Sequence, residues 1–176
     1  MKKHTQFAHS DVNFNDSLPG IGRDKLELLL PHDFPGRDYF ISFYSNKNGG
    51  YFDGGAYIYL EDFHDLKPGD RDLFEIEAFH FIPSFEKQEN ERLTSTSEVI
   101  EFRKIAHNVS SIFLKENIPF AGDAGDNDFW LNTSTGFISY TITNELTTHP
   151  STKFVAPDFR TFCNAIRGSL KPMSGH

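Results

Sequence analysis

The chain of 176 residues has little cysteine: Cys163 is the only one, so no intrachain disulfide can form. This excludes the disulfide framework that is typical of small secreted domains. Long hydrophobic runs are also missing. No apolar stretch approaches the ~20 residues of a membrane-spanning helix, and no apolar signal-peptide core follows the start of the chain. We therefore expect a cytoplasmic protein with no membrane partner.

Basic residues are scarce relative to acidic ones. Lys and Arg number 17 and Asp and Glu number 25, which gives a formal charge of −8. A negative protein repels the phosphate backbone, so this balance argues against direct binding of nucleic acid. The same charge favours a basic protein partner, because opposite fields accelerate encounter. An alternative reading is that the charge serves solubility alone.

Phenylalanine is abundant, with 19 residues against a single Trp. Its side chain offers a large apolar area with no polar group to satisfy, so a chain of this length can build a dense core. The length fits one domain. We expect that domain over residues 23–170, preceded by a polar arm at 1–22 and followed by a frayed tail at 171–176. We expect the protein to be a monomer.

The residue pattern alternates between helical and strand periodicity. Apolar residues spaced by three or four predict helices, which are expected over 38–44, 95–116 and 157–170. Alternating or β-rich runs predict strands, which are expected over 56–60, 73–82 and 137–143, with a strand–turn–strand unit over 120–131. This order predicts an α+β single domain with a largely antiparallel mixed sheet, flanked by about three to four helices.

Two of these helices carry specific expectations. The middle helix begins at a capping box, Ser95 to Glu98. Its apolar stripe is expected to comprise Val99, Phe102, Ala106, Val109 and Phe113. The last helix places Cys163 on its apolar stripe, where a buried thiol behaves as a small hydrophobe rather than a nucleophile.

Signatures of catalysis and of metal binding are missing. The sequence contains no Gly-x-Ser-x-Gly, His-Glu-x-x-His or phosphate-binding glycine loop, so we expect neither an enzyme nor a cofactor. The carboxylates between Asp123 and Asp128 fail the calcium-loop count, because Asp128 stands where the loop needs glycine and Ser134 where it needs glutamate. A turn bonded to its own backbone is the alternative that we prefer. His64, His80 and His107 share no metal-ligand spacing.

Three segments in order resemble a known family. The first runs from Leu30-Pro31 through an aromatic helix to Asn48-Gly49-Gly50. The second is the strand and Asp/Gly-rich turn of 120–131, and the third is a strand after Thr135-Gly136 followed by the helix that begins near Pro157. Over residues ~26–168 the chain resembles the SUKH superfamily, which includes bacterial immunity proteins and fungal cell-wall regulators. A short helix before Leu30 and an Asp-Ala-Gly-Asp turn depart from the usual pattern.

The resemblance implies a binding function. Such proteins look like cognate inhibitors of toxin domains, often nucleases or other nucleic-acid-modifying enzymes, and the alternative is a regulatory interaction domain without a toxin partner. We expect acidic contacts from the turn and from one strand face, and aromatic anchors around the Asp53-Gly54-Gly55 turn. The acidic candidates are Glu75, Glu77, Asp123, Asp126 and Asp128, and the aromatic candidates are Tyr51, Phe52, Tyr57 and Tyr59.

Overall fold

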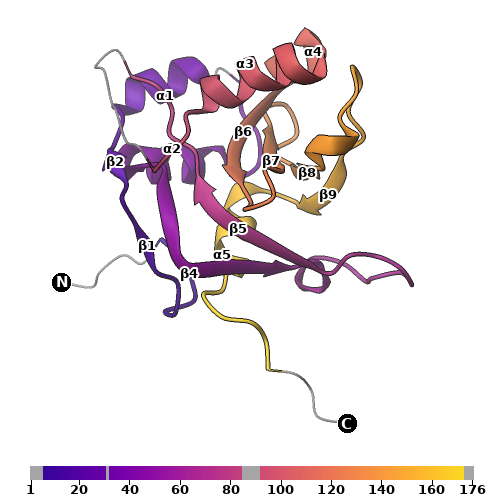
Figure 1. Ribbon diagram of the computed structural model, residues 1–176. Coiled ribbons are helices and arrows are strands. Elements are labelled where there is room, and N and C mark those ends of the chain that lie inside the picture. The colour runs from indigo at the N-terminus through magenta and orange to yellow at the C-terminus, as the bar shows by residue number, and fades with distance from the viewer. Residues whose placement is uncertain (1–5, 31, 85–91, 173–176) are drawn as a thin grey trace, which may run out of the picture.

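The computed structural model describes residues 6–30, 32–84 and 92–172, and its centre is one antiparallel sheet. Within these residues the sheet has seven strands in the order β1-β4-β5-β6-β7-β8-β9, and a second sheet pairs β2 with β3. Every strand pair is antiparallel. The predicted α+β domain with a largely antiparallel sheet is confirmed (Figure 1).

The elements follow the predicted order, with short additions. The α-helices of the described residues are α1 (Arg23–Leu29), α2 (Arg37–Asn46), α3 (Thr96–His107), α4 (Ser111–Glu116) and α5 (Phe159–Ala165). The strands are β1 (Phe14–Asn15), β2 (Leu18–Pro19), β3 (Lys47–Asn48), β4 (Gly50–Tyr59), β5 (Leu73–Phe79), β6 (Asn117–Gly122), β7 (Asp128–Asn132), β8 (Ile138–Thr141) and β9 (Lys153–Ala156). Strand β9 was not expected from the sequence.

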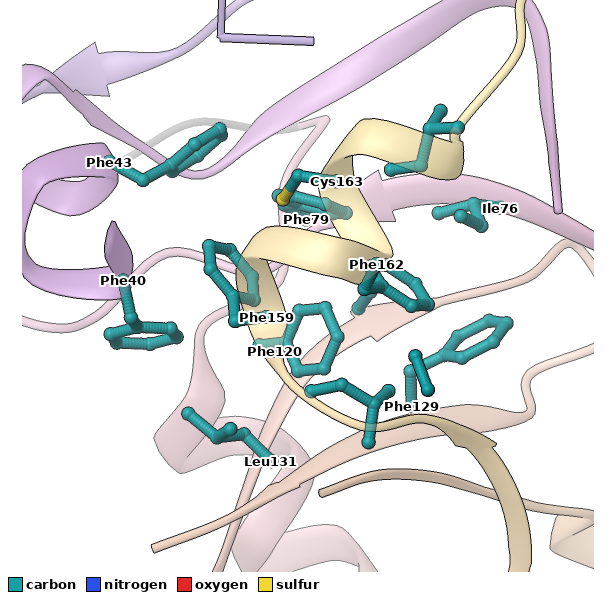
Figure 2. Close-up of a cluster of buried hydrophobic side chains, with 14 of the residues drawn as sticks. Phe40, Phe43, Ile76, Phe79, Phe120, Phe129, Leu131, Phe159, Phe162 and Cys163 are labelled. Carbon is teal, nitrogen blue, oxygen red and sulfur yellow. The ribbon is translucent and has the colours of Figure 1, made fainter. Parts of the chain in front are cut away.

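Helices α2 and α5 cover one face of the sheet with aromatic side chains. The rings of Phe40 and Phe159 lie 4.9 Å apart, and those of Phe120 and Phe162 lie 5.3 Å apart. Figure 2 shows Phe159 and Phe162 of α5 directed at Phe120 and Phe129 of the sheet. The abundance of Phe thus forms the main core, as its composition predicts.

Helices α3 and α4 lie on the opposite face, over β6 and β7 (Figure 1). Trp130 is the centre of this smaller core, where it packs with Val109 and Leu114. Its indole Nε1 donates to Thr141 Oγ1 at 2.8 Å. The indole therefore has a partner for its one polar atom, as a buried tryptophan requires.

The prediction of one long helix over 95–116 is wrong, because the chain forms two helices there, α3 and α4. The Ser95–Glu98 capping box is present, but Asn108 takes a left-handed conformation with φ 53° and ends α3. Ser110 then caps α4. The predicted stripe is also wrong, since Phe102 is 52% exposed while α3 buries Thr96, Val99 and Arg103. The arginine, not the phenylalanine, faces the sheet.

Strands β4 and β5 form a long hairpin that extends away from the body of the protein (Figure 1). The glycines Gly54 and Gly55 do not make the predicted chain-reversing turn. They lie inside β4 at positive φ, where the register with β5 shifts between Tyr51 and Ala56. Glycine tolerates this backbone without strain, so the strand bulges and continues.

Residues 6–22, expected as part of a polar arm, pack against the domain. Phe7, Phe14 and Ile21 are buried in the main core, and β1 pairs with the start of β4. Three apolar side chains in a polar stretch were enough to anchor it. Residues 1–5 of the expected arm lie outside the described part of the chain.

The last helix is shorter than predicted. Asp158 caps it, it ends at Ala165, and Leu170 is 54% exposed rather than part of its stripe. Lys171 of the expected frayed tail is anchored, because its backbone N–H donates to Tyr59 Oη at 3.0 Å. Residues 173–176 of that tail lie outside the described residues.

Across the described residues, no helix combines the length and the apolar character needed to cross a membrane.

The burial of Cys163 leads to a first prediction. The side chain is 0% exposed, and burial raises the pKa of its thiol well above the ordinary value. The thiolate is the reactive form, so a thiol reagent should label the native protein far more slowly than the protein in denaturant. Mass spectrometry of timed samples would measure this, and fast stoichiometric labelling of the native protein would contradict the burial.

Candidate functional site

The acidic turn between β6 and β7 is held by hydrogen bonds from its own residues. Asp123 Oδ1 accepts from the backbone N–H of Gly125 at 2.8 Å and of Asn127 at 3.0 Å. Its Oδ2 accepts from the hydroxyl of Tyr140 at 2.6 Å. The turn therefore has the backbone-bonded form that the sequence favours over a calcium loop.

A buried arginine binds the other two carboxylates of this turn. Arg103 of α3 is 1% exposed, and its Nε donates to Asp128 Oδ2 at 2.7 Å. Its Nη2 donates to Asp128 Oδ1 at 3.1 Å, to Asp126 Oδ1 at 2.9 Å and to the Asp126 carbonyl at 2.9 Å. The guanidinium of Arg103 thus connects α3 to the turn through charge-assisted hydrogen bonds from two of its nitrogens.

These hydrogen bonds stabilise the charged form of Arg103 and engage the carboxylates of Asp128 and Asp126. Burial lowers the pKa of Arg103, but the hydrogen bonds that it donates to Asp128 and Asp126 outweigh burial and keep this pKa above the ordinary value. Asp128 is 2% exposed and fully engaged, so the prediction that it contacts a partner is wrong. The side chain of Asp126 is 71% exposed but is also bound to Arg103. The turn is chiefly structural.

A polar cavity of about 230 Å³ lies beside the turn. Its lining residues are Tyr51, Glu77, Ala78, His80, Arg92, Thr94, Val99, Gly122, Asp123, Ala124, Asp126, Asn127 and Asp128. The imidazole of His80 is 8% exposed, and within the described structure neither ring nitrogen has a hydrogen-bond partner. Burial, and then the positive charge of Arg103, lower the pKa of His80 to about 4. The ring is therefore neutral at neutral pH.

Tyrosine and glutamate side chains share the outer face of the β4–β5 hairpin. Tyr57 is paired with Glu75, and Tyr59 with Leu73. Their strand neighbours Ile58 and Phe74 are buried in the core, so the paired residues point to the other face. Tyr57 and Tyr59 are half-buried and Glu75 is exposed. The structure thus brings together three of the predicted contact residues.

The remaining aromatic candidates, Phe52 and Tyr51, differ in how deeply they are buried. Phe52 is 2% exposed and packs in the main core, so its prediction as a contact anchor is wrong. The reason is alternation, which turns it inward beside an outward neighbour. Tyr51 is half-buried at the rim of the cavity, where its hydroxyl donates to Glu77 Oε1 at 3.2 Å. Arg92 stacks on its ring, with Cζ 3.6 Å from the centroid.

Two other surface features lie away from these residues. Helices α3 and α4 expose Phe102, Ile105 and Ile112 by 52%, 73% and 71%. A cavity of about 940 Å³ lies where the N-terminal segment packs on α2, and it is lined by Phe7, Phe14 and Phe43 among others. The second feature holds none of the predicted site residues, so its size does not make it the candidate site.

The described residues offer no arrangement for metal binding, since no three or more His, Cys, Asp or Glu side chains are grouped to hold an ion. Neither Arg103 nor Arg92 was predicted from the sequence to belong to a site, and His80 was assigned to none. A signal for Arg103 was present: it lies at helical spacing from Thr96 and Val99, on the face that α3 buries.

The chain was compared with known proteins at the level of families and of individual sequences. No protein-family model matches it, and a search of curated proteins finds no match. The SUKH resemblance therefore stays a prediction.

The buried ion pair leads to a second prediction. Arg103→Met should lower the free energy of unfolding by about 3–5 kcal/mol, because it leaves Asp128 buried without a counter-charge. Chemical denaturation would measure the change. Lys104→Met, at the exposed neighbour, should change it by less than about 0.5 kcal/mol. Adding Asp128→Leu to Arg103→Met should recover much of the loss, and an unchanged stability of the single variant would refute the anchoring role.

The buried imidazole leads to a third prediction. The pKa of His80 is about 4 in the folded state against 6.5 ordinarily, so between these values the unfolded chain binds more protons. Stability should fall by roughly 3 kcal/mol as pH drops from about 6.5 to about 4. His80→Gln should reduce this dependence, measured by denaturation at several pH values. The matched control His149→Gln, at an exposed histidine, should retain it.

Proposed function

We propose that the chain is a non-catalytic immunity protein that binds a cognate bacterial toxin domain and neutralises it. The observation that carries this proposal is the concentration of negative charge on the β4–β5 hairpin. Residues 50–80 contain eight acidic and two basic side chains, and they account for most of the formal charge of −8. A basic surface, such as that of a nuclease domain, complements this hairpin.

Part of the hairpin charge is neutralised from within the protein. Lys171 contacts Glu61, and its Nζ lies 2.9 Å from Asp62. Arg92 lies 2.7 Å from Asp53. Glu75 makes no ion pair with any described residue, and it lies beside Tyr57 on the outer face. The proposed contact surface is therefore centred on Tyr57 and Glu75.

The chemistry of this surface suits a tight protein contact. Interfaces of this kind bury about 800 Å² per partner and depend on a few aromatic anchors inside a polar rim. Tyr57 and Tyr59 offer rigid apolar rings with a polar tip, and Glu75 and Glu77 supply the charge. Binding that covers a toxin's active surface needs no chemistry from this chain.

The alternative function is a regulatory interaction domain with no toxin partner. The exposed apolar face of α3 and α4 is a second contact surface, which such a domain offers to an apolar partner. The two functions differ in what the chain must do in a cell, because only an immunity protein rescues growth.

The fourth prediction tests the function directly. Co-expression of the chain with the toxin encoded beside it should restore growth of a sensitive host, because the complex blocks the toxin. Gel filtration of the purified mixture should show one complex. Absence of both rescue and complex would discard the immunity function and favour the regulatory domain.

The fifth prediction tests the contact surface. Tyr57→Ala should weaken the complex at least about tenfold through faster dissociation. Glu75→Lys should slow association, and raised salt should do the same to the wild type, while dissociation changes little. Surface plasmon resonance would separate the two rates. Glu101→Lys, a charge reversal on exposed α3, is the control, and loss of binding in Ile105→Ser instead would move the contact surface to α3 and α4.

A further inference from the structure

The polar cavity beside the acidic turn has the features of a binding site that the turn alone lacks. The backbone of His80 is fixed on both sides: its N–H donates to the Phe120 carbonyl at 2.7 Å, and its carbonyl accepts from Tyr44 Oη at 3.0 Å. The imidazole lines the cavity with both nitrogens unpartnered among the described residues. A buried polar group without a partner costs free energy, so a ligand that supplies one is favoured.

The space next to the ring is kept open by Gly122. A Cβ at this position would lie 3.3 Å from His80 Nε2 and 3.3 Å from its Cε1. Any larger side chain would therefore fill the cavity at the imidazole. The cavity of about 230 Å³ is smaller than the roughly 300 Å³ at which pockets for drug-sized ligands begin, and it suits a single side chain.

The charge of the lining selects a cation. Among the described residues, four carboxylates and one guanidinium line the cavity. Arg103 offsets the charge of Asp126 and Asp128, and Arg92 is committed to Asp16 and Asp53. Within the described part of the chain, Glu77 accepts only the Tyr51 hydroxyl. A neutral imidazole adds a lone-pair acceptor.

We infer that this cavity receives the guanidinium group of an arginine side chain from the basic partner, with Glu77 and His80 as its acceptors. A guanidinium presents five N–H donors in a planar fork, which matches acceptors that belong to separate side chains better than a compact ammonium does. The inference rests on the proposed function for its partner, but the cavity's preference for guanidinium is a property of this chain alone.

The position of the cavity agrees with the proposed contact surface. Glu77 lies on β5 two residues from Glu75, and Tyr51 lies on β4, so the cavity opens beside the Tyr57–Glu75 face of the same hairpin. An arginine that enters the cavity would be desolvated and paired, as the central charged anchors of tight interfaces are.

The test uses argininamide as the probe and the imidazole resonances of His80 as the readout. Titration of the full chain at neutral pH should shift these resonances saturably at millimolar probe, and lysinamide should shift them at least about fivefold less. Glu77→Gln should reduce the affinity for argininamide at least about fivefold. Glu101→Gln, at an exposed position of α3 outside the cavity lining, should leave it unchanged.

A second variant keeps the test independent of charge. Gly122→Ala should block the probe by placing a methyl group beside His80 Nε2, with the fold checked by circular dichroism. Absence of a saturable shift, an equal response to lysinamide, or unchanged binding in Glu77→Gln would each overturn the inference. Toxin neutralisation that persists alongside such a result would overturn the cavity assignment alone. Argininamide binding without any toxin complex would overturn the proposed function alone.

Discussion

The ion pair between Arg103 and the carboxylates of Asp126 and Asp128 is the constraint on which the site depends. A guanidinium that is 1% exposed is stable only with paired counter-charges, so α3 and the β6–β7 turn must meet in one geometry. That geometry places Val99 and Asp126 on the wall of the polar cavity. It also gives the acidic turn a structural role, and it leaves Phe102 of α3 facing solvent.

The same constraint separates two kinds of acidic residue. The aspartates of the turn are consumed by hydrogen bonds to Arg103, Tyr140 and the turn backbone. The glutamates of β5 form no ion pairs with described residues. Alternation along this half-buried strand turns their side chains away from the core. Under the proposed function, a partner meets the charge of the hairpin rather than that of the turn. Both groups contribute to the net charge, but the aspartates of the turn are already hydrogen-bonded within the protein.

The cavity and the hairpin face together describe one way to hold a basic protein. In the proposed complex, the rim glutamates and tyrosines serve encounter and apolar contact, and the small acidic cavity beside a neutral imidazole serves one specific anchor. Both functions proposed for the chain are forms of binding. They differ in whether the bound surface belongs to a toxin, which is a property of the partner.

The sequence by itself determined the fold class, the order of its main elements, the phenylalanine core and the burial of Cys163, because periodicity and apolar content are local properties. It also identified Tyr57, Tyr59 and Glu75 as surface candidates. Only the tertiary structure decided which candidates are buried, as it did for Phe52 and Asp128. Arg103 finds its partners 23 and 25 residues away, and His80 lies beside Gly122 of β6 and shares a cavity with Asp126 of the turn. The physical reason is that the pairing of charges and the shape of a cavity depend on long-range packing. The local periodicity of the sequence carries no information about that packing.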